Sequence, residues 1–155
     1  MTALFEPGYL DTGLRLLLAV LGGSLIGLNR FLRHKSAGMR THGLVALGAA
    51  MATLMAAHIG DADAISRVAQ GVVTGVGFVG AGVIMRDGES HIQGLTTAAS
   101  IWGCAILGVV CGVADLAIAA FGIVLAMAIL LLGRPLERFV ARLANDEVAA
   151  EDRRD

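Results

Sequence analysis

Four basic side chains, Arg30, Arg33, Lys35 and Arg40, lie between two apolar segments near the N-terminus. Close to an anionic membrane surface, each can contribute ~1 kcal/mol to binding a lipid headgroup, an anion or an acidic partner. Anchoring by the positive-inside rule explains Arg33 and Lys35 equally well without a ligand. Arg30 and Arg40 stand where one apolar segment ends and the next begins. An unpaired guanidinium there costs ~2.5–3.5 kcal/mol, so both need polar partners.

Polar side chains that could pair with these arginines surround the third connection between apolar segments. Asp87 and Glu89 follow the third segment, and Thr96 and Thr97 begin the fourth. We predict a polar cluster at one mouth of the helix bundle, which serves either as a structural network or as a functional site. Its members are Arg30, Lys35, Arg40, Thr41, Asp87, Thr96, Thr97 and Ser100.

The third apolar segment combines polar residues with glycine. Gln70 and Thr74 lie one helical turn apart, so they could line a polar path or form hydrogen bonds between helices. Each glycine costs about 1 kcal/mol of helix propensity, which close contacts with other helices would have to offset. This pattern predicts a glycine-rich central third helix, and we expect Trp102 to be packed within the bundle. The glycines are Gly71, Gly75, Gly77, Gly80 and Gly82.

Gly75, Gly77 and Gly80 also satisfy the GxGxxG pattern of dinucleotide-binding sites. That motif requires a turn from a strand into a helix and an acidic residue about 20 positions later. Here the glycines lie inside an apolar run, and Ser100 stands at the expected acidic position. The pattern therefore does not indicate a nucleotide cofactor.

Enzyme and metal chemistry find little support in the sequence. It contains no nucleophile elbow, no HExxH motif and no phosphate loop. Cys104 and Cys111 have neither metal-site nor disulfide-framework spacing. Mg²⁺ prefers carboxylate oxygens, and no Asp or Glu lies deep in the last four apolar segments. We expect no catalysis and no cofactor, and the sequence assigns no metal ligands.

The elements that must position these residues are membrane spans. Of the 155 residues, 56% are hydrophobic and 16% are charged, against roughly 25% charged residues in soluble domains. Segments of 18–20 apolar residues are long enough to cross ~30 Å of hydrocarbon. The sequence predicts an all-α polytopic membrane protein with five spans, at about 10–28, 41–59, 68–85, 95–114 and 116–133.

Basic residues predict the orientation of the spans. They concentrate in the first connection and after the last span, which places both in the cytoplasm and the N-terminus outside. We expect a transmembrane domain over 1–135, followed over 136–155 by a short amphipathic helix and a disordered cytoplasmic tail. The net charge of −1 gives no reason to expect a nucleic-acid partner.

Three sequence blocks resemble the MgtC/SapB family. They are Ala-Gly-Met-Arg-Thr at 37–41, Gly-Phe-Val-Gly-Ala-Gly at 77–82 and Gly-Leu-Thr-Thr-Ala-Ala-Ser-Ile-Trp at 94–102. With Gly27, Arg30 and Lys35, the similarity covers most of residues 22–112. The resemblance implies a bacterial inner-membrane protein linked to growth under magnesium limitation, acid stress or survival inside phagocytes, and hence to virulence.

The resemblance also implies one of two alternative activities. Some family members are thought to modulate partner membrane proteins, including the F-type ATP synthase, whereas older naming treats them as magnesium transporters. We expect a non-catalytic modulator that self-associates as a homodimer, with magnesium or other small-ion transport as the alternative.

The chain departs from the family pattern in three places. Many members have an acidic residue where this chain has Asn29, and several have asparagine where Thr96 stands. We expect the chain to lack the soluble C-terminal domain of the longer members.

Overall fold

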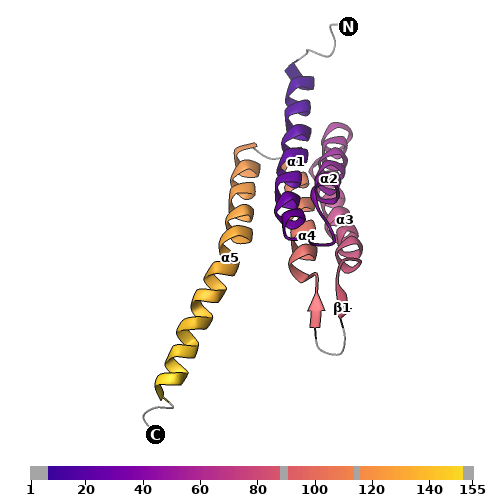
Figure 1. The fold of residues 1–155 in the computed structure, drawn as a ribbon. Helices are drawn as coiled ribbons and strands as arrows, with labels where there is room; N and C mark the ends of the chain where they lie inside the picture. The colour runs from indigo at the N-terminus through magenta and orange to yellow at the C-terminus, as the bar shows by residue number, and fades with distance from the viewer. Residues whose placement is uncertain (1–6, 88–90, 114–115, 152–155) are drawn as a thin grey trace.

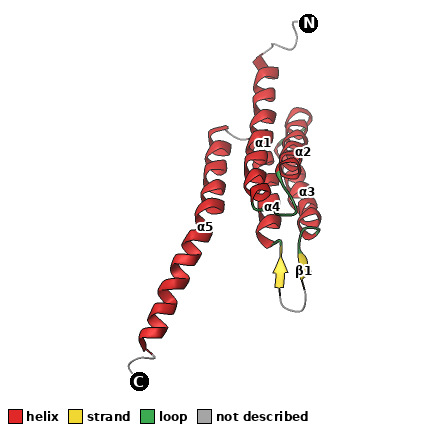
Figure 2. Cartoon of the chain, in the orientation of Figure 1, coloured by secondary structure: helices red, strands yellow, loops and turns green. Residues whose placement is uncertain are grey.

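The computed structural model describes residues 7–87, 91–113 and 116–151 of the chain. Five helices and a small antiparallel hairpin make up this part (Figures 1 and 2). All five helices are long and apolar enough to cross a membrane, which confirms the predicted all-α polytopic fold. The elements are α1 (Pro7–Leu32), α2 (Met39–Ile59), α3 (Ala62–Ala81), β1 (Met85–Asp87), β2 (His91–Gln93), α4 (Leu95–Val113) and α5 (Leu116–Glu151).

Local backbone bonds set the ends of the first and third helices. After α1, His34 adopts a left-handed φ of 53°, and the N–H of Lys35 donates to the Arg30 carbonyl at 3.0 Å. This is the Schellman arrangement, which satisfies carbonyl groups that the helix leaves free. At the start of α3, the Asp61 carboxylate accepts a hydrogen bond from the Ala64 N–H at 3.0 Å. This cap starts α3 six residues before the predicted span at 68–85.

The centre of the bundle is formed by α2 and α4, which contact each other and both pack against α1 and α3. Glycines bring α1 very close to α2. A Cβ atom added at Gly23 would lie 2.7 Å from the His42 carbonyl oxygen, and one at Gly27 would lie 2.7 Å from the Gly38 carbonyl oxygen. On α4, Gly108 and Gly112 face α2 in the same way. The two GxxxG pairs therefore pack within the chain.

The expectation of a central third helix is wrong. Helix α3 packs against α2 and α4 at the edge of the bundle, and little of its surface is buried. Its contact side carries Val76, which belongs to a small cluster with Ile101 and Ala105 of α4. Gly71, Gly75 and Gly77 instead face open space, since a Cβ at any of them would meet nothing within 4 Å. Of the α3 glycines, Gly80 packs against another helix of this chain, whereas Gly71, Gly75 and Gly77 make no such contact.

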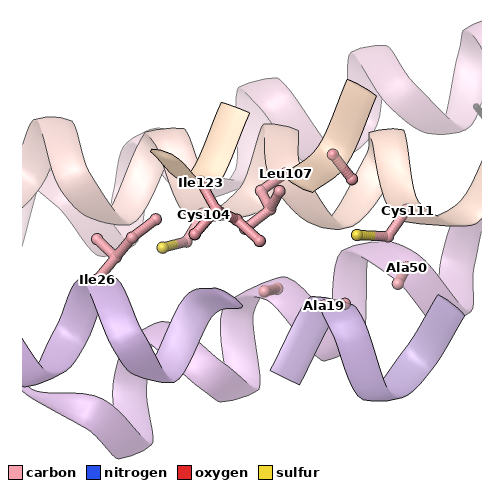
Figure 3. Close-up of a cluster of buried hydrophobic side chains, with 9 residues drawn as sticks. Ala19, Ile26, Ala50, Cys104, Leu107, Cys111 and Ile123 are labelled. Carbon is pink, nitrogen blue, oxygen red and sulfur yellow. The ribbon is translucent and has the colours of Figure 1, made fainter. Parts of the chain in front are cut away.

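A compact cluster of mostly small side chains joins α1, α2, α4 and the first turns of α5 (Figure 3). Ala19 and Ile26 come from α1, Cys104 and Leu107 from α4, and Ile123 from α5. Cys104 and Cys111 are both buried as free thiols. Small side chains suit a membrane bundle because helices attract one another in lipid mainly through close van der Waals contact.

A two-stranded hairpin between α3 and α4 was not predicted. Met85 pairs with Gln93 and Arg86 pairs with Ile92 in antiparallel register. Each strand has three residues, which is too short to give an alternating pattern of apolar and polar residues. At its end Gly94 has φ +94°, and its carbonyl accepts the N–H of Ala98 at 2.8 Å in the first turn of α4. The hairpin thus leads directly into the helix that carries three predicted site residues.

The expected break after the fifth span does not occur. Helix α5 runs without interruption from Leu116 to Glu151 and contains Pro135. The predicted short helix from 136 and disordered tail from 145 are therefore wrong as far as Glu151, while 152–155 lie outside the described residues. A proline removes one hydrogen bond and crowds one turn. Strong helix formers on both sides of Pro135 let α5 continue past it.

The basic segments lie on the same side of the bundle. The α1–α2 connection, the hairpin and the C-terminal end of α5 occupy one end, and the N-terminal ends of α1 and α5 occupy the other (Figure 1). The N-terminal end of α1 and the C-terminal end of α5 thus lie at opposite ends of the bundle, as an odd number of membrane spans requires. Which of the two ends faces the cytoplasm stays a prediction from the distribution of arginine and lysine.

Candidate functional site

Arg30 lies in the last turn of α1 and is only 3% exposed. Its Nη2 donates a hydrogen bond to Asn29 Oδ1 at 2.8 Å. Its Nε has no hydrogen-bond partner among the residues that the structure describes. The guanidinium groups of Arg33 and Arg134 are close enough to act on Arg30 electrostatically. A buried cation that faces two further cations is an unusual arrangement, because buried charges are normally paired.

His42, in the first turn of α2, is completely buried and links three elements. Its Nδ1 lies 2.9 Å from the Gly38 carbonyl, which can only accept, so Nδ1 carries the proton. The Nε2 of the neutral ring then accepts from the Ser100 hydroxyl of α4 at 2.9 Å. Ser100 Oγ also lies 2.8 Å from the Thr97 carbonyl, the alternative acceptor for its proton. Arg30 acts electrostatically on the same ring.

Replacing Ser100 with alanine tests this link between α2 and α4. We expect Ser100→Ala to lower the free energy of unfolding by about 1–3 kcal/mol, because His42 Nε2 would remain buried without its partner. Thr96→Ala, on the exposed side of the same helix, should change it by less than about 0.5 kcal/mol. Unfolding in mixed detergent micelles, followed by circular dichroism, measures both. Equal effects of the two substitutions would show that the bond contributes nothing.

The structure gathers part of the predicted polar cluster. Thr97 is 1% exposed, and with Ser100 it lies at the end of the bundle that holds Arg30. Thr41 is half-buried in the first turn of α2, but Arg40 beside it is exposed. The two arginines that sequence reasoning treated together thus differ, because the first turn of α2 directs position 40 away from the bundle.

The other predicted members are more dispersed. Thr96 is exposed on α4, and Lys35 is half-buried in the α1–α2 connection. Asp87 lies in β1, but its side chain is not among the described side chains, and Glu89 lies outside the described residues. The proposed pairing of these carboxylates with arginine stays a prediction. Sequence reasoning left out His42, which the structure places at the centre of the cluster.

The predicted path residues do not line the inside of this bundle. Gln70 and Thr74 are exposed on α3, on the edge helix. Gly80 is buried and packs against Ala98 of α4, at an ordinary contact distance of 3.7 Å for an added Cβ. Gly82 follows the end of α3 and meets only carbonyl groups of its own helix. Trp102 is 48% exposed and borders a groove between α4 and α5, so its expected packing within the bundle is wrong.

A second polar link lies at the opposite end of α1. Arg15 Nε donates to Asp11 Oδ2 at 2.6 Å, and residues four apart in a helix are well placed for such an ion pair. Arg15 Nη1 also donates to the Cys111 carbonyl at 3.2 Å, close to the end of α4. A cation is favourable at a helix C-terminus, so Arg15 stabilises the junction between α1 and α4.

The sequence model of the MgtC family matches residues 16–139, which include the whole of α2, α3 and α4. The chain belongs to the MgtC family. A protein named MgtC from Salmonella typhimurium is 46% identical over 120 residues, covering 76% of this chain and 51% of that protein. A protein named MgtC from Brucella abortus is 42% identical over 118 residues, covering 76% of this chain and 49% of that protein.

A third relative of this MgtC-family chain is the protein named SrpB from Synechococcus elongatus. It is 45% identical over 127 residues, which cover 72% of this chain and 70% of SrpB. The chain spans about half the length of the MgtC relatives that it matches. No solved structure matches the chain. The five apolar helices and the family membership identify a multi-pass membrane protein.

The described side chains of this MgtC-family chain do not form a cluster of metal ligands. Within residues 7–87, 91–113 and 116–151, no group of three or more His, Cys, Asp or Glu side chains is arranged to hold an ion. The polar cluster instead presents guanidinium, imidazole and hydroxyl groups. Its chemistry suits the binding of an anion.

Proposed function

We propose that this protein is a non-catalytic modulator of other membrane proteins in the bacterial inner membrane. By its family resemblance, it would serve adaptation to low magnesium, acid or intracellular stress. The observation that carries the proposal is the exposed face of α3. Gln70 and Thr74 are exposed there beside Gly71 and Gly75, whose Cβ positions are open.

This face is poorly suited to lipid and well suited to another helix. Lipid tails offer no hydrogen-bond partner for the Gln70 amide, whereas a neighbouring transmembrane helix does. Gly71 and Gly75 form a small-xxx-small pair, which lets two helix backbones approach closely. The partner would be a transmembrane helix, either of another membrane protein such as the F-type ATP synthase or of a second copy of this chain in a homodimer.

The alternative is transport of magnesium or another small ion. A path through one chain would need Gln70 and Thr74 to face the same space as Thr96. Thr96 borders the groove between α4 and α5, and the α3 residues do not. The arginines at the same end would also repel a dication. The alternative nevertheless predicts a direct signal, Mg²⁺ flux into liposomes.

Co-reconstitution with the F-type ATP synthase tests both activities. We expect the protein to change ATP-driven proton pumping, because helix contact alters the partner, and to leave Mg²⁺ entry at the level of protein-free liposomes. The double variant Gly71→Leu/Gly75→Leu should reduce the change in pumping at least tenfold. Gly13→Leu is the control, since its Cβ also meets nothing within 4 Å but lies on α1, away from α3.

Two results would contradict the proposal. One is Mg²⁺ entry that Gln70→Leu or Thr96→Val abolishes, which would establish transport. The other is a change in pumping that the double α3 variant and Gly13→Leu affect equally. Crosslinking between two differently tagged copies, with and without the α3 substitutions, distinguishes self-association from contact with the synthase.

A further inference from the structure

A groove of about 510 Å³ runs between α4 and α5 and is closed on one side by Ile26 of α1. Its lining is apolar along nearly its whole length, and its hydroxyl groups are those of Thr96 and Ser100. Both lie in the first turns of α4, so the polar groups are confined to one end. From Thr96 to Val110 the groove follows 14 helical steps, or about 21 Å, which exceeds one ~15 Å leaflet of hydrocarbon.

Arginines continue the helix faces that line this groove at its polar end. On α1, Arg30 follows Ile26 by four residues, and on α5, Arg134 follows Leu130 by four residues. Residues four apart in a helix share a face. Arg30 and Arg134 therefore each lie one helical turn beyond a lining residue, and the electrostatic effect of Arg134 on Arg30 agrees with this placement.

The positive charge at this end is not neutralised by the described part of the chain. Arg30 is 97% buried, calculated from its 3% exposure, and its Nε lacks a hydrogen-bond partner. Among described side chains, the ion pair found joins Arg15 to Asp11 at the far end of α1. A guanidinium buried at membrane depth requires an anion or polar acceptors. Cationic side chains outnumber anionic ones among the described residues at this end, which favours the binding of an anion.

We propose that the α4–α5 groove binds one anionic phospholipid, with its phosphate at Arg30 and Arg134 and an acyl chain along the apolar lining. This inference is independent of the proposed modulator function, which rests on α3. A phospholipid supplies both required parts, an anion at the membrane surface and a long apolar tail. Its phosphate can accept from the exposed Arg134 and from the Thr96 hydroxyl, which lines the groove, and the buried charge of Arg30 favours an anion at this end.

The size of the groove suits a small apolar group such as an acyl chain. Its volume of about 510 Å³ falls in the ~300–1,000 Å³ range of sites for small molecules.

Native mass spectrometry of the delipidated full chain in detergent tests the proposal. We expect phosphatidylglycerol to bind with at least tenfold lower Kd than phosphatidylethanolamine with the same acyl chains. Arg134→Gln should weaken phosphatidylglycerol binding about fivefold and leave phosphatidylethanolamine unchanged, because one cation near an anionic headgroup is lost. Arg134 is exposed, so this variant keeps the fold. Arg30→Gln should have a larger effect.

Substitutions within the groove test the acyl-chain half of the proposal. Gly122 borders the groove, and a Cβ there would meet nothing within 4 Å. Gly122→Leu should place a branched side chain in this space. We expect it to raise the Kd for both lipids at least tenfold. Gly48 on α2 is equally open but does not border the groove. Gly48→Leu should therefore leave the Kd for both lipids unchanged.

Three outcomes would overturn the proposal. The first is equal affinity for the two lipids, and the second is lipid binding that Gly122→Leu leaves unchanged. The third is displacement of phosphatidylglycerol by millimolar inorganic phosphate, which would identify a site for a free anion. Since the α3 variants are not used, a failure here leaves the modulator proposal untouched.

Discussion

Gly108→Ala is expected to lower the free energy of unfolding by about 3 kcal/mol, because it inserts a methyl group between two helix backbones. The added Cβ would collide with the Ala46 carbonyl of α2 and lie 2.8 Å from the Ala49 Cβ. A carbonyl in the middle of a helix cannot rotate away, so α2 and α4 must separate. These two helices form the centre of the bundle, and their separation would also disturb α1 and α3.

The control for this prediction lies on the same helix. Gly103 faces open space, so Gly103→Ala creates no collision and should gain up to about 1 kcal/mol of helix propensity. Unfolding both variants in mixed micelles, with helicity followed by circular dichroism, gives the two free energies. If Gly108→Ala were as stable as Gly103→Ala, the close approach of α2 and α4 would be incorrect.

Gly94→Ala is expected to cost about 2–3 kcal/mol and to loosen the start of α4, since two penalties combine at this position. The backbone φ of +94° is unfavourable for any residue with a Cβ, and that Cβ would collide with the Val83 carbonyl. Gly94 also provides the carbonyl that accepts the Ala98 N–H in the first turn of α4. The substitution should therefore also displace Ser100 from His42.

Gly82→Ala is the matched control at the other end of the same connection. Gly82 has an ordinary helical φ of −63°, and an added Cβ would make its nearest contact at 3.4 Å. Unfolding free energies, together with hydrogen exchange of the first α4 amides, measure both variants. Faster exchange in Gly82→Ala than in Gly94→Ala would contradict the role given to Gly94.

The spans were predictable from sequence because lipid imposes a simple rule of length and hydropathy. Helix α2 begins within two residues of its predicted start and ends at the predicted Ile59. The rule works less well where polar residues enter a helix. Asp61 and Asp63 lowered the apparent hydropathy at the start of α3, although Asp61 caps this helix.

The place of each helix in the bundle was much less predictable. Gly108 on α4 and Gly75 on α3 belong to the same kind of small-residue pattern, yet the first meets α2 and the second meets open space. A pair of glycines four residues apart indicates that a helix can approach another helix closely. The spacing does not indicate whether that other helix belongs to the same chain or to a different one. The central position of α3 could not be decided from this pattern.

The candidate site was predicted in part. Arg30 could be found because it ends an apolar segment, where a guanidinium requires partners. His42 was left out of the predicted cluster, although it directly follows Thr41, which was included. A usable signal was present, since His42, Ala46 and Thr53 lie on one face of α2 with small or polar side chains. All three are buried against neighbouring helices.

The uninterrupted length of α5 has a mechanical consequence. Its 36 residues extend for about 54 Å, whereas its packing against the bundle reaches only as far as Leu130. The part of α5 beyond Leu130 therefore acts as a lever arm of about 32 Å. A tilt of about 10° at those contacts would move the far tip by roughly 5 Å. Small changes in what fills the space beside α4 would therefore be magnified at the tip.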